Sequence, residues 1–362
     1  EGTREAPLAV ERLVVATVPV AAPREEYAPS AEDDGGAGDD DSMAADASSE
    51  SPEPLPVRPI RPLDLRFAEP EPEPEPDPEP RALDTETRLR LESYARELAA
   101  ARGPKPLAVV ERLFTAAYVP LRDALDRGAD LPACRAAADE WAAGFEHSYS
   151  EAYDALRVRT KRPTMVVDVP DLALRVARLH GARSTQLLLV DGLRYDLAEA
   201  VNERLQLLAG RRAACAERYL LWAALPTTTA TQVELIGRGP AGLRDAAGAP
   251  PDDLVVARGN KAGTLRRLKA GHRELLKLDI VEARIAEPGG PSAARLEAVA
   301  DEVADRLALH FDGLAPRTLV MVFGDHGFRV RREGSAPVAT QGGASPEEVL
   351  VPASAWLVGA VH

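Results

Sequence analysis

Short apolar runs alternate with segments of helical periodicity from about residue 161 to the end of the chain. Runs of this length predict buried strands, and apolar residues spaced three or four apart predict amphipathic helices. The predicted strands are residues 165–169, 187–190, 218–224, 275–280, 318–323 and 349–358. The predicted helices are residues 171–179, 196–208 and 293–311, with another starting over 230–236. This alternation predicts an α/β fold, with a mainly parallel sheet covered by helices on both faces.

The preceding residues, 84–150, have a different pattern, in which leucines recur at helical steps among Ala, Arg and Glu. This composition predicts a helical domain. Gly103-Pro104 and Pro120 are expected to divide it into about three helices. An aromatic residue recurs every fourth position, which indicates a packing face rather than a site of chemistry. These residues are Trp141, Phe145 and Tyr149.

The acidic charge of the chain is concentrated in one segment. Residues 24–84 carry 19 acidic and 5 basic residues, whereas the rest of the chain carries 39 of each sign. The segment includes the alternating Pro-Glu run of residues 69–80 and contains too few apolar residues to offset its ordering entropy. It is therefore predicted to be a disordered, extended linker, and a spacer role is preferred to partner binding. Residues 1–23 read as a fragment, in which 13–18 could be the last strand of an upstream domain or part of a lone piece tethered by the linker.

The sequence is thus divided into four parts, with the helical domain at 85–160 and the α/β domain at 161–362. Its two cysteines, Cys134 and Cys215, lack the spacing of metal ligands. Unpaired cysteines of this kind predict a reduced, cytoplasmic protein. No apolar run approaches the ~20 residues of a membrane span, so no membrane partner is expected.

Three polar motifs adjoin the apolar runs. Asp191-Gly192 follows the strand at 187–190, and Asp325-His326 follows the strand at 318–323. The third motif, Pro-Thr-Thr-Thr229, precedes a predicted helix. Ligand sites in α/β sheets form at the carboxyl ends of strands, and carboxylates with imidazoles are suitable zinc ligands. A hydroxyl beside a cation loses its proton more easily and becomes a nucleophile.

Each motif also has a structural interpretation. Asp191-Gly192 could be a plain turn after a strand. Thr229 to Gln232 matches a helix capping box, as does Thr231 to Glu234. An Asp-His pair directly after a buried strand has little structural use, so Asp325-His326 is the strongest functional signal.

The order of these motifs resembles that in the alkaline phosphatase superfamily. The segments 191–196, 226–229 and 342–352 resemble the PglZ branch, which occurs in bacteriophage-exclusion defence systems and some signalling proteins. The resemblance covers residues 162–362. It implies an alkaline-phosphatase-like fold and a divalent metal, zinc, whose ligands would be Asp191, Asp325 and His326. It also implies Thr229 as the nucleophile, with Thr228 as the second choice.

The sequence departs from this family at a second metal site, which resembles one built from an Asp and two His. Gln341 stands where family members place the last His. The carboxylate ligand could be Asp279 or Glu282, and His310 is a weak further candidate. We therefore expect one intact metal site and one impaired site.

Two functions follow from the resemblance. The leading hypothesis is a metal-dependent hydrolase of phosphoesters or phosphodiesters, with a phosphorylated small molecule or nucleotide as substrate. The alternative is a catalytically impaired protein that assembles with other defence-system subunits; a sensor without turnover is a third possibility. Arg194 and Tyr195 could position a phosphate or form a surface turn. A basic run could contact nucleic acid, although a solvated helix face is the preferred interpretation. Its residues are Arg258, Lys261, Arg266, Arg267, Lys269 and Arg273.

Overall fold

The computed structural model describes residues 83–103, 105–159, 161–244, 256–333 and 336–359. All of these residues belong to one compact unit. The predicted fragment at 1–23 lies outside the described residues, as does the predicted linker except for its last two residues.

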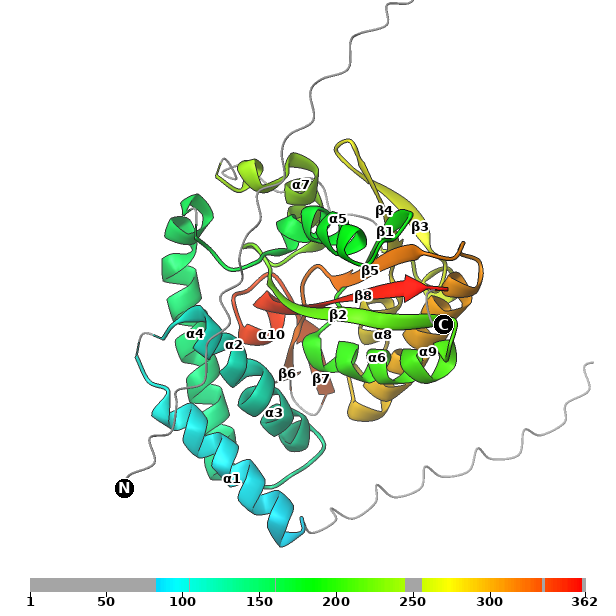
Figure 1. The fold of residues 1–362 in the computed structure, drawn as a ribbon. Coiled ribbons are helices and arrows are strands. Elements are labelled where there is room, and N and C mark those ends of the chain that lie inside the picture. The colour runs from blue at the N-terminus through cyan, green and yellow to red at the C-terminus, as the bar shows by residue number, and fades with distance from the viewer. Residues whose placement is uncertain (1–82, 104, 160, 245–255, 334–335, 360–362) are drawn as a thin grey trace, which may run out of the picture. The chain divides into compact units, whose positions relative to one another are not determined.

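The centre of the fold is a six-stranded sheet with the order β2-β8-β5-β1-β4-β3 (Figure 1). Its strands are β1 (Ser184–Val190), β2 (Ala213–Trp222), β3 (Arg266–Ala270), β4 (Arg273–Leu278), β5 (Thr318–Gly324) and β8 (Leu350–Val358). β1 pairs in parallel with β4 and β5, whereas β8 runs antiparallel to both its neighbours and β3 runs antiparallel to β4. The α/β class is therefore confirmed, but the sheet is mixed rather than mainly parallel.

Two local features make the sheet mixed. β3 and β4 are joined by a tight hairpin at Gly271, where φ is +60°. β8 enters the sheet after a separate two-stranded hairpin, β6 (Arg329–Glu333) with β7 (Ala336–Thr340), and the short helix α10 (Pro346–Val349). Neither hairpin was predicted from the sequence.

Helices cover both faces of the sheet, as predicted. α5 (Val169–Leu179) and α7 (Thr229–Arg238) pack on one face. α6 (Tyr195–Ala209), α8 (Ile280–Ile285) and α9 (Ala293–Asp312) pack on the other. The buried side chains of β1 alternate between the two cores, because successive residues of a strand point to opposite faces. Full burial of each Leu or Val stabilises the fold by roughly 1.5–3 kcal/mol, so both layers hold the central strands in place.

One predicted strand is wrong. Residues 166–168 form a short 3-10 helix instead of a strand, and Met165 alone makes a bridge to Trp222. The Asp168 carboxylate accepts a hydrogen bond from the Met165 amide at 2.8 Å and pairs with Arg162 at 2.5 Å. These local bonds favour a tight turn, while the apolar side chains are still buried in the core.

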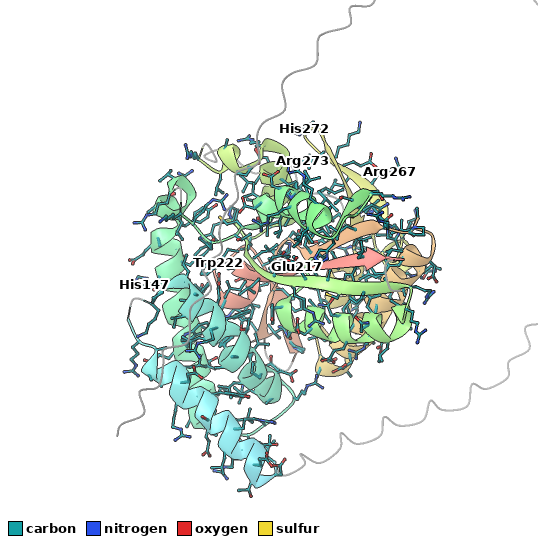
Figure 2. All side chains as sticks on the ribbon, in the orientation of Figure 1. His147, Glu217, Trp222, Arg267, His272 and Arg273 are labelled. Atoms are coloured by element: carbon teal, nitrogen blue, oxygen red, sulfur yellow. The ribbon has the colours of Figure 1, made fainter. Side chains whose placement is uncertain are left out.

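The basic run is also corrected, because it does not lie on a helix face. Most of its members come from the β3–β4 hairpin and the turn before it, and Figure 2 labels Arg267 and Arg273 on this hairpin. Arg267 pairs with Glu274, and Arg273 lies 3.8 Å from Asp171. The hairpin forms because Gly271 adopts a positive φ, which makes the tight turn between the two strands and is incompatible with a continuous helix.

The helical prediction for the N-terminal part of the described chain is confirmed. It contains α1 (Thr85–Ala100), α2 (Leu107–Leu113), a π-helical turn (Phe114–Tyr118), α3 (Val119–Asp126) and α4 (Pro132–Val158). Pro120 does not end a helix as expected, because the chain remains helical from residue 107 to 126. The wide π turn before it accommodates the proline ring, which would clash in a regular α-helix.

The aromatic stripe on α4 is a packing face, as predicted. The ring centroids of Trp141 and Tyr118 lie 4.9 Å apart, and those of Phe145 and Trp222 lie 5.6 Å apart. The Tyr149 hydroxyl donates to the Ala223 carbonyl at 2.7 Å. Figure 2 shows Trp222 beside α4. These contacts fix the end of β2, and the chain continues from there into the threonine motif.

Cys134 is buried, Cys215 is half-buried, and neither forms a disulfide. No helix in the described parts of the chain has both the length and the apolar character needed to cross a membrane.

Candidate metal centre

The candidate site lies where the three central parallel strands end. Asp191 follows β1, Asp279 follows β4, and Asp325 with His326 follows β5. The last residues of these strands lie opposite one another in the sheet register. Their carboxyl ends therefore bring together the polar residues that the sequence placed after separate apolar runs.

Two glycines allow the loops at this edge to approach each other. Gly192 has a φ of +72°, and its amide donates to Asp325 Oδ1 at 3.1 Å. A Cβ at Gly324 would lie 2.5 Å from the Leu193 carbonyl oxygen, so a larger residue there would push the loops apart. The Asp-Gly segment is thus a turn, and it also delivers Asp191 to the site.

Asp191, Asp325 and His326 form a buried triad whose potential ligand atoms all lie within 4.8 Å of one another. His326 Nε2 lies 3.6 Å from Asp191 Oδ1 and 3.7 Å from Asp325 Oδ2. His326 Nδ1 lies 2.8 Å from the Gly327 carbonyl oxygen and is the nitrogen that donates. Nε2 therefore points toward the carboxylates, and it becomes a metal ligand when it gives up its proton. Within the described ranges, no other group of three His, Cys, Asp or Glu side chains has this spacing.

The triad fits a divalent cation. Asp325 Oδ2 is fully buried and has no hydrogen-bond partner. A buried carboxylate oxygen without a partner is unfavourable, and a cation would satisfy it. Burial acts to lower the pKa of His326, but the charges of Asp325 and Asp191 outweigh this effect and raise it. Two carboxylates and one imidazole match a zinc site that keeps a position open for substrate.

The threonine motif reaches the triad through the start of α7. Thr228 is the N-cap, and its hydroxyl accepts a hydrogen bond from the Thr231 amide at 3.3 Å. Thr229 is the first helical residue, and its half-buried hydroxyl donates to Asp191 Oδ1 at 2.7 Å. The same oxygen lies 3.1 Å from His326 Nε2. Thr229 therefore contacts the triad, whereas Thr228 caps the helix.

Both capping boxes considered in the sequence are wrong by this geometry. The Gln232 side chain does not return to the helix start but bonds the Ala224 amide at 3.0 Å and its carbonyl at 2.8 Å. Glu234 pairs with Arg238 one turn further along α7.

The loop after β7 brings Gln341 close to the threonine motif. The Gly342 amide donates to the Thr227 hydroxyl at 3.1 Å, and that hydroxyl donates to the Gly343 carbonyl at 2.7 Å. Glu348 holds the same loop by accepting from the Gly343 amide at 3.0 Å. Gln341 thus comes to line a cavity of about 390 Å³.

Glu282 lines the same cavity. Its Oε2 atom is buried and has no hydrogen-bond partner. Burial and the charge of Asp191 raise the pKa of Glu282 to about 7. Of the two acidic residues considered for a second metal, Glu282 is therefore the one that lines the same cavity as Gln341.

Asp279 lies beside Asp191 but is already engaged by cations. It contacts the Lys277 ammonium at 2.7 Å, forms an ion pair with Arg266 and accepts from the Ala257 amide at 2.9 Å. Its oxygens are therefore not available to a second metal in this arrangement, and it is not a member of the triad.

His310 is far from the triad. Its Nε2 lies 2.8 Å from Oε1 of Gln186, a residue of β1. Gln186 precedes Asp191 by five residues, which is roughly 16 Å along a strand. His310 therefore cannot supply a ligand at this edge, and that expectation is wrong.

Lys277 is a member of the site that sequence analysis missed. It lies on β4, is buried, and its Nζ atom is 2.5 Å from Asp191 Oδ2. Burial acts to lower the pKa of this ammonium, but Asp191 and Asp279 outweigh burial and raise it. The available signal was a lysine that interrupts an apolar run two residues before an acidic residue.

Arg194 is buried rather than part of a surface turn. Its guanidinium donates to both Asp196 oxygens, at 2.6 and 2.5 Å, and lies 4.9 Å from the Phe328 ring centre. These contacts join the loop after Asp191 to the segment after His326, so the role of Arg194 in the structure is to hold the two loops together.

No protein-family model matches this sequence, and no curated protein matches it.

Proposed function

We propose that this chain is a metal-dependent phosphoester hydrolase of the PglZ type, within the alkaline phosphatase superfamily. One observation carries the proposal: the Thr229 hydroxyl lies between Asp191 and His326, two members of a triad in which a buried Asp325 oxygen has no hydrogen-bond partner. A nucleophile, a cation-binding triad and an open ligand position are the parts that phosphoryl transfer to a hydroxyl requires. The substrate class is a phosphorylated small molecule or a nucleotide, in phage defence or signalling.

A divalent ion bound by the triad would supply positive charge that favours the deprotonated Thr229 hydroxyl and the transferred phosphoryl group. Asp191 Oδ1 accepts the hydroxyl hydrogen bond and orients Thr229 for attack. The Thr229 proton passes to water as the Thr229 oxygen bonds to phosphorus and the bond to the leaving oxygen breaks, and the leaving oxygen takes up a proton from water. A water molecule next attacks the phosphothreonine, the bond between phosphorus and Thr229 breaks, and a proton of the attacking water restores the Thr229 hydroxyl as the phosphate product is released.

The start of α7 also favours an anionic substrate. Thr229 is the first residue of this ten-residue helix, so a phosphoryl group on its hydroxyl would lie at the positive end of the helix dipole. The motif order in the sequence, together with the meeting of Asp191, Thr229 and Asp325 at one sheet edge, supports the assignment to this superfamily.

A second function is favoured by the rest of the site. Gln341 offers only a neutral amide, which is a poorer zinc ligand than imidazole, and Asp279 is engaged by Lys277 and Arg266. These features suit a catalytically impaired protein that serves as an assembly subunit with other defence proteins.

One pair of variants separates the two functions. The purified protein and its His326→Ala and His310→Ala variants are loaded with zinc, and metal content is measured by mass spectrometry. Hydrolysis of an aryl phosphate and of an aryl phosphodiester is measured in parallel. We expect His326→Ala to lose both the ion and turnover, and His310→Ala to keep both, since His310 lies at the other end of β1. If the parent protein is inert at every zinc concentration, the hydrolase proposal fails and the assembly function replaces it.

A further inference from the structure

The proposed mechanism leaves one buried charge without a function. The Lys277 side chain is 3% exposed, and it lies between two carboxylates that follow neighbouring strands. Its Nζ atom is 2.5 Å from Asp191 Oδ2 and 2.7 Å from Asp279 Oδ1. A charged amine is rarely buried unless it is paired, and here it is paired on both sides.

The two oxygens of Asp191 are thereby given separate tasks. Oδ1 accepts from Thr229 and lies 3.6 Å from His326 Nε2, whereas Oδ2 contacts Lys277. A cation that bridges Asp191 and Asp279 occupies the place where a second divalent ion would bind these two carboxylates. Arg266 adds further positive charge on the far side of Asp279.

We propose that Lys277 is a built-in cation of this centre, which fills an Asp191–Asp279 cation site so that the centre takes one divalent ion. This inference rests on the proposed function. Lys277 is a positioning residue: it neutralises Asp191 and Asp279 and directs Asp191 Oδ1 toward Thr229. The buried lysine also supplies the positive charge that lets these two carboxylates lie close together.

The proposal implies a latent magnesium site. Removal of the lysine side chain would leave space between Asp191 Oδ2 and Asp279 Oδ1, with room for water. Two carboxylate oxygens and several waters are the ligands that Mg²⁺ prefers. A substitution that removes the charge but fills the space would not create this site.

Lys277→Ala and Lys277→Met provide the matched pair, because both remove the charge and only alanine opens the space. Each protein is loaded with zinc and titrated with Mg²⁺, while native mass spectrometry counts the ions and a thermal melt reports Tm. We expect the parent and Lys277→Met to hold one zinc, with no Mg²⁺-dependent change in Tm. Lys277→Ala should hold one zinc and one magnesium ion, and its Tm should rise with Mg²⁺ because a bound ion stabilises the folded state.

Two results would overturn the proposal. One is a parent protein that binds Mg²⁺ as well as zinc. The other is a folded Lys277→Ala protein that binds zinc but no magnesium. Lys277→Ser replaces the alanine variant if that variant does not fold. The measurement on the parent protein tests the proposal without any variant. A parent that binds no ion at all refutes the proposed function instead, so the two failures are distinguishable.

Discussion

The two adjacent threonines at the start of α7 allow a sharp test, because the structure gives them different tasks. Thr228→Ala removes the N-cap acceptor of the Thr231 amide, which costs about 1 kcal/mol. For a compact unit of this size, that loss lowers Tm by roughly 2–4 °C. Thr229 does not cap the helix, but its hydroxyl donates to Asp191, and loss of one hydrogen bond also costs about 1 kcal/mol, so the two variants should have similar Tm values.

Activity, by contrast, should separate the two variants. Thr229→Ala removes the proposed nucleophile, and loss of a nucleophile lowers kcat by on the order of 1000-fold or more. Thr228→Ala keeps that hydroxyl and should retain most of the turnover. Both variants are assayed at saturating zinc with an aryl phosphate, and their melts are recorded in the same buffer.

The pattern of results decides the interpretation. An inactive Thr228→Ala beside an active Thr229→Ala means that the neighbouring hydroxyl attacks phosphorus, and the choice of Thr229 is wrong. Equal losses of activity and Tm in both variants mean that the helix start matters and neither hydroxyl does. Full activity in both refutes threonine as the nucleophile.

Two further predictions concern pH and the cavity beside the triad. Between about pH 4.5 and 7 the ion-free protein should lose stability as pH rises, because the raised pKa values of Glu282 and His326 mean that the folded state holds protons that the unfolded state has released. For Glu282, a change of pKa from 4.5 to about 7 corresponds to at most about 3 kcal/mol in the free energy of unfolding. Saturating zinc should reverse the trend, because protons compete with the ion for His326. Urea denaturation at several pH values, with and without zinc, measures both slopes, and a flat ion-free profile would contradict the site electrostatics. Gln341→His should raise zinc binding and turnover by adding an imidazole to the cavity that Glu282 lines, and Glu282→Gln in the same chain should cancel the gain. An equal gain with and without Glu282 would show that the new imidazole acts elsewhere.

Helices and strands whose form depends on the nearby sequence were predictable, and so were the positions of the residues at their ends. β1 and β5 are apolar on both faces because helices cover both, and this pattern alone predicts that Asp191 and Asp325 lie at the sheet edge. The threonine motif was predicted to start a helix. The cap and the hydroxyl that faces the triad differ by one position, however, so local sequence did not separate Thr228 from Thr229.

The remainder depended on distant contacts. Lys277 is buried because its partners, Asp191 and Asp279, follow β1 and β4. The local sequence shows a lysine within an apolar run, but it does not identify a partner that lies across the sheet. Asp279 was considered a free ligand because the sequence does not reveal its ion pairs with Lys277 and Arg266. The basic run was predicted to lie on a helix, but the turn at one glycine, Gly271, makes most of it a hairpin. Residues 166–168 show that a short apolar run in the core can be a 3-10 turn as well as a strand.

Direct detection of a phosphoryl group on Thr229 tests the central claim most closely. The zinc-loaded protein is mixed with an aryl phosphate, quenched in acid within the first turnover, and digested for peptide mass spectrometry. We predict one phosphoryl group on the peptide that contains Thr229, located on that residue and absent from the Thr229→Ala protein. Turnover of the substrate with no phosphoryl group on Thr229, or with the group on another residue, would contradict the account.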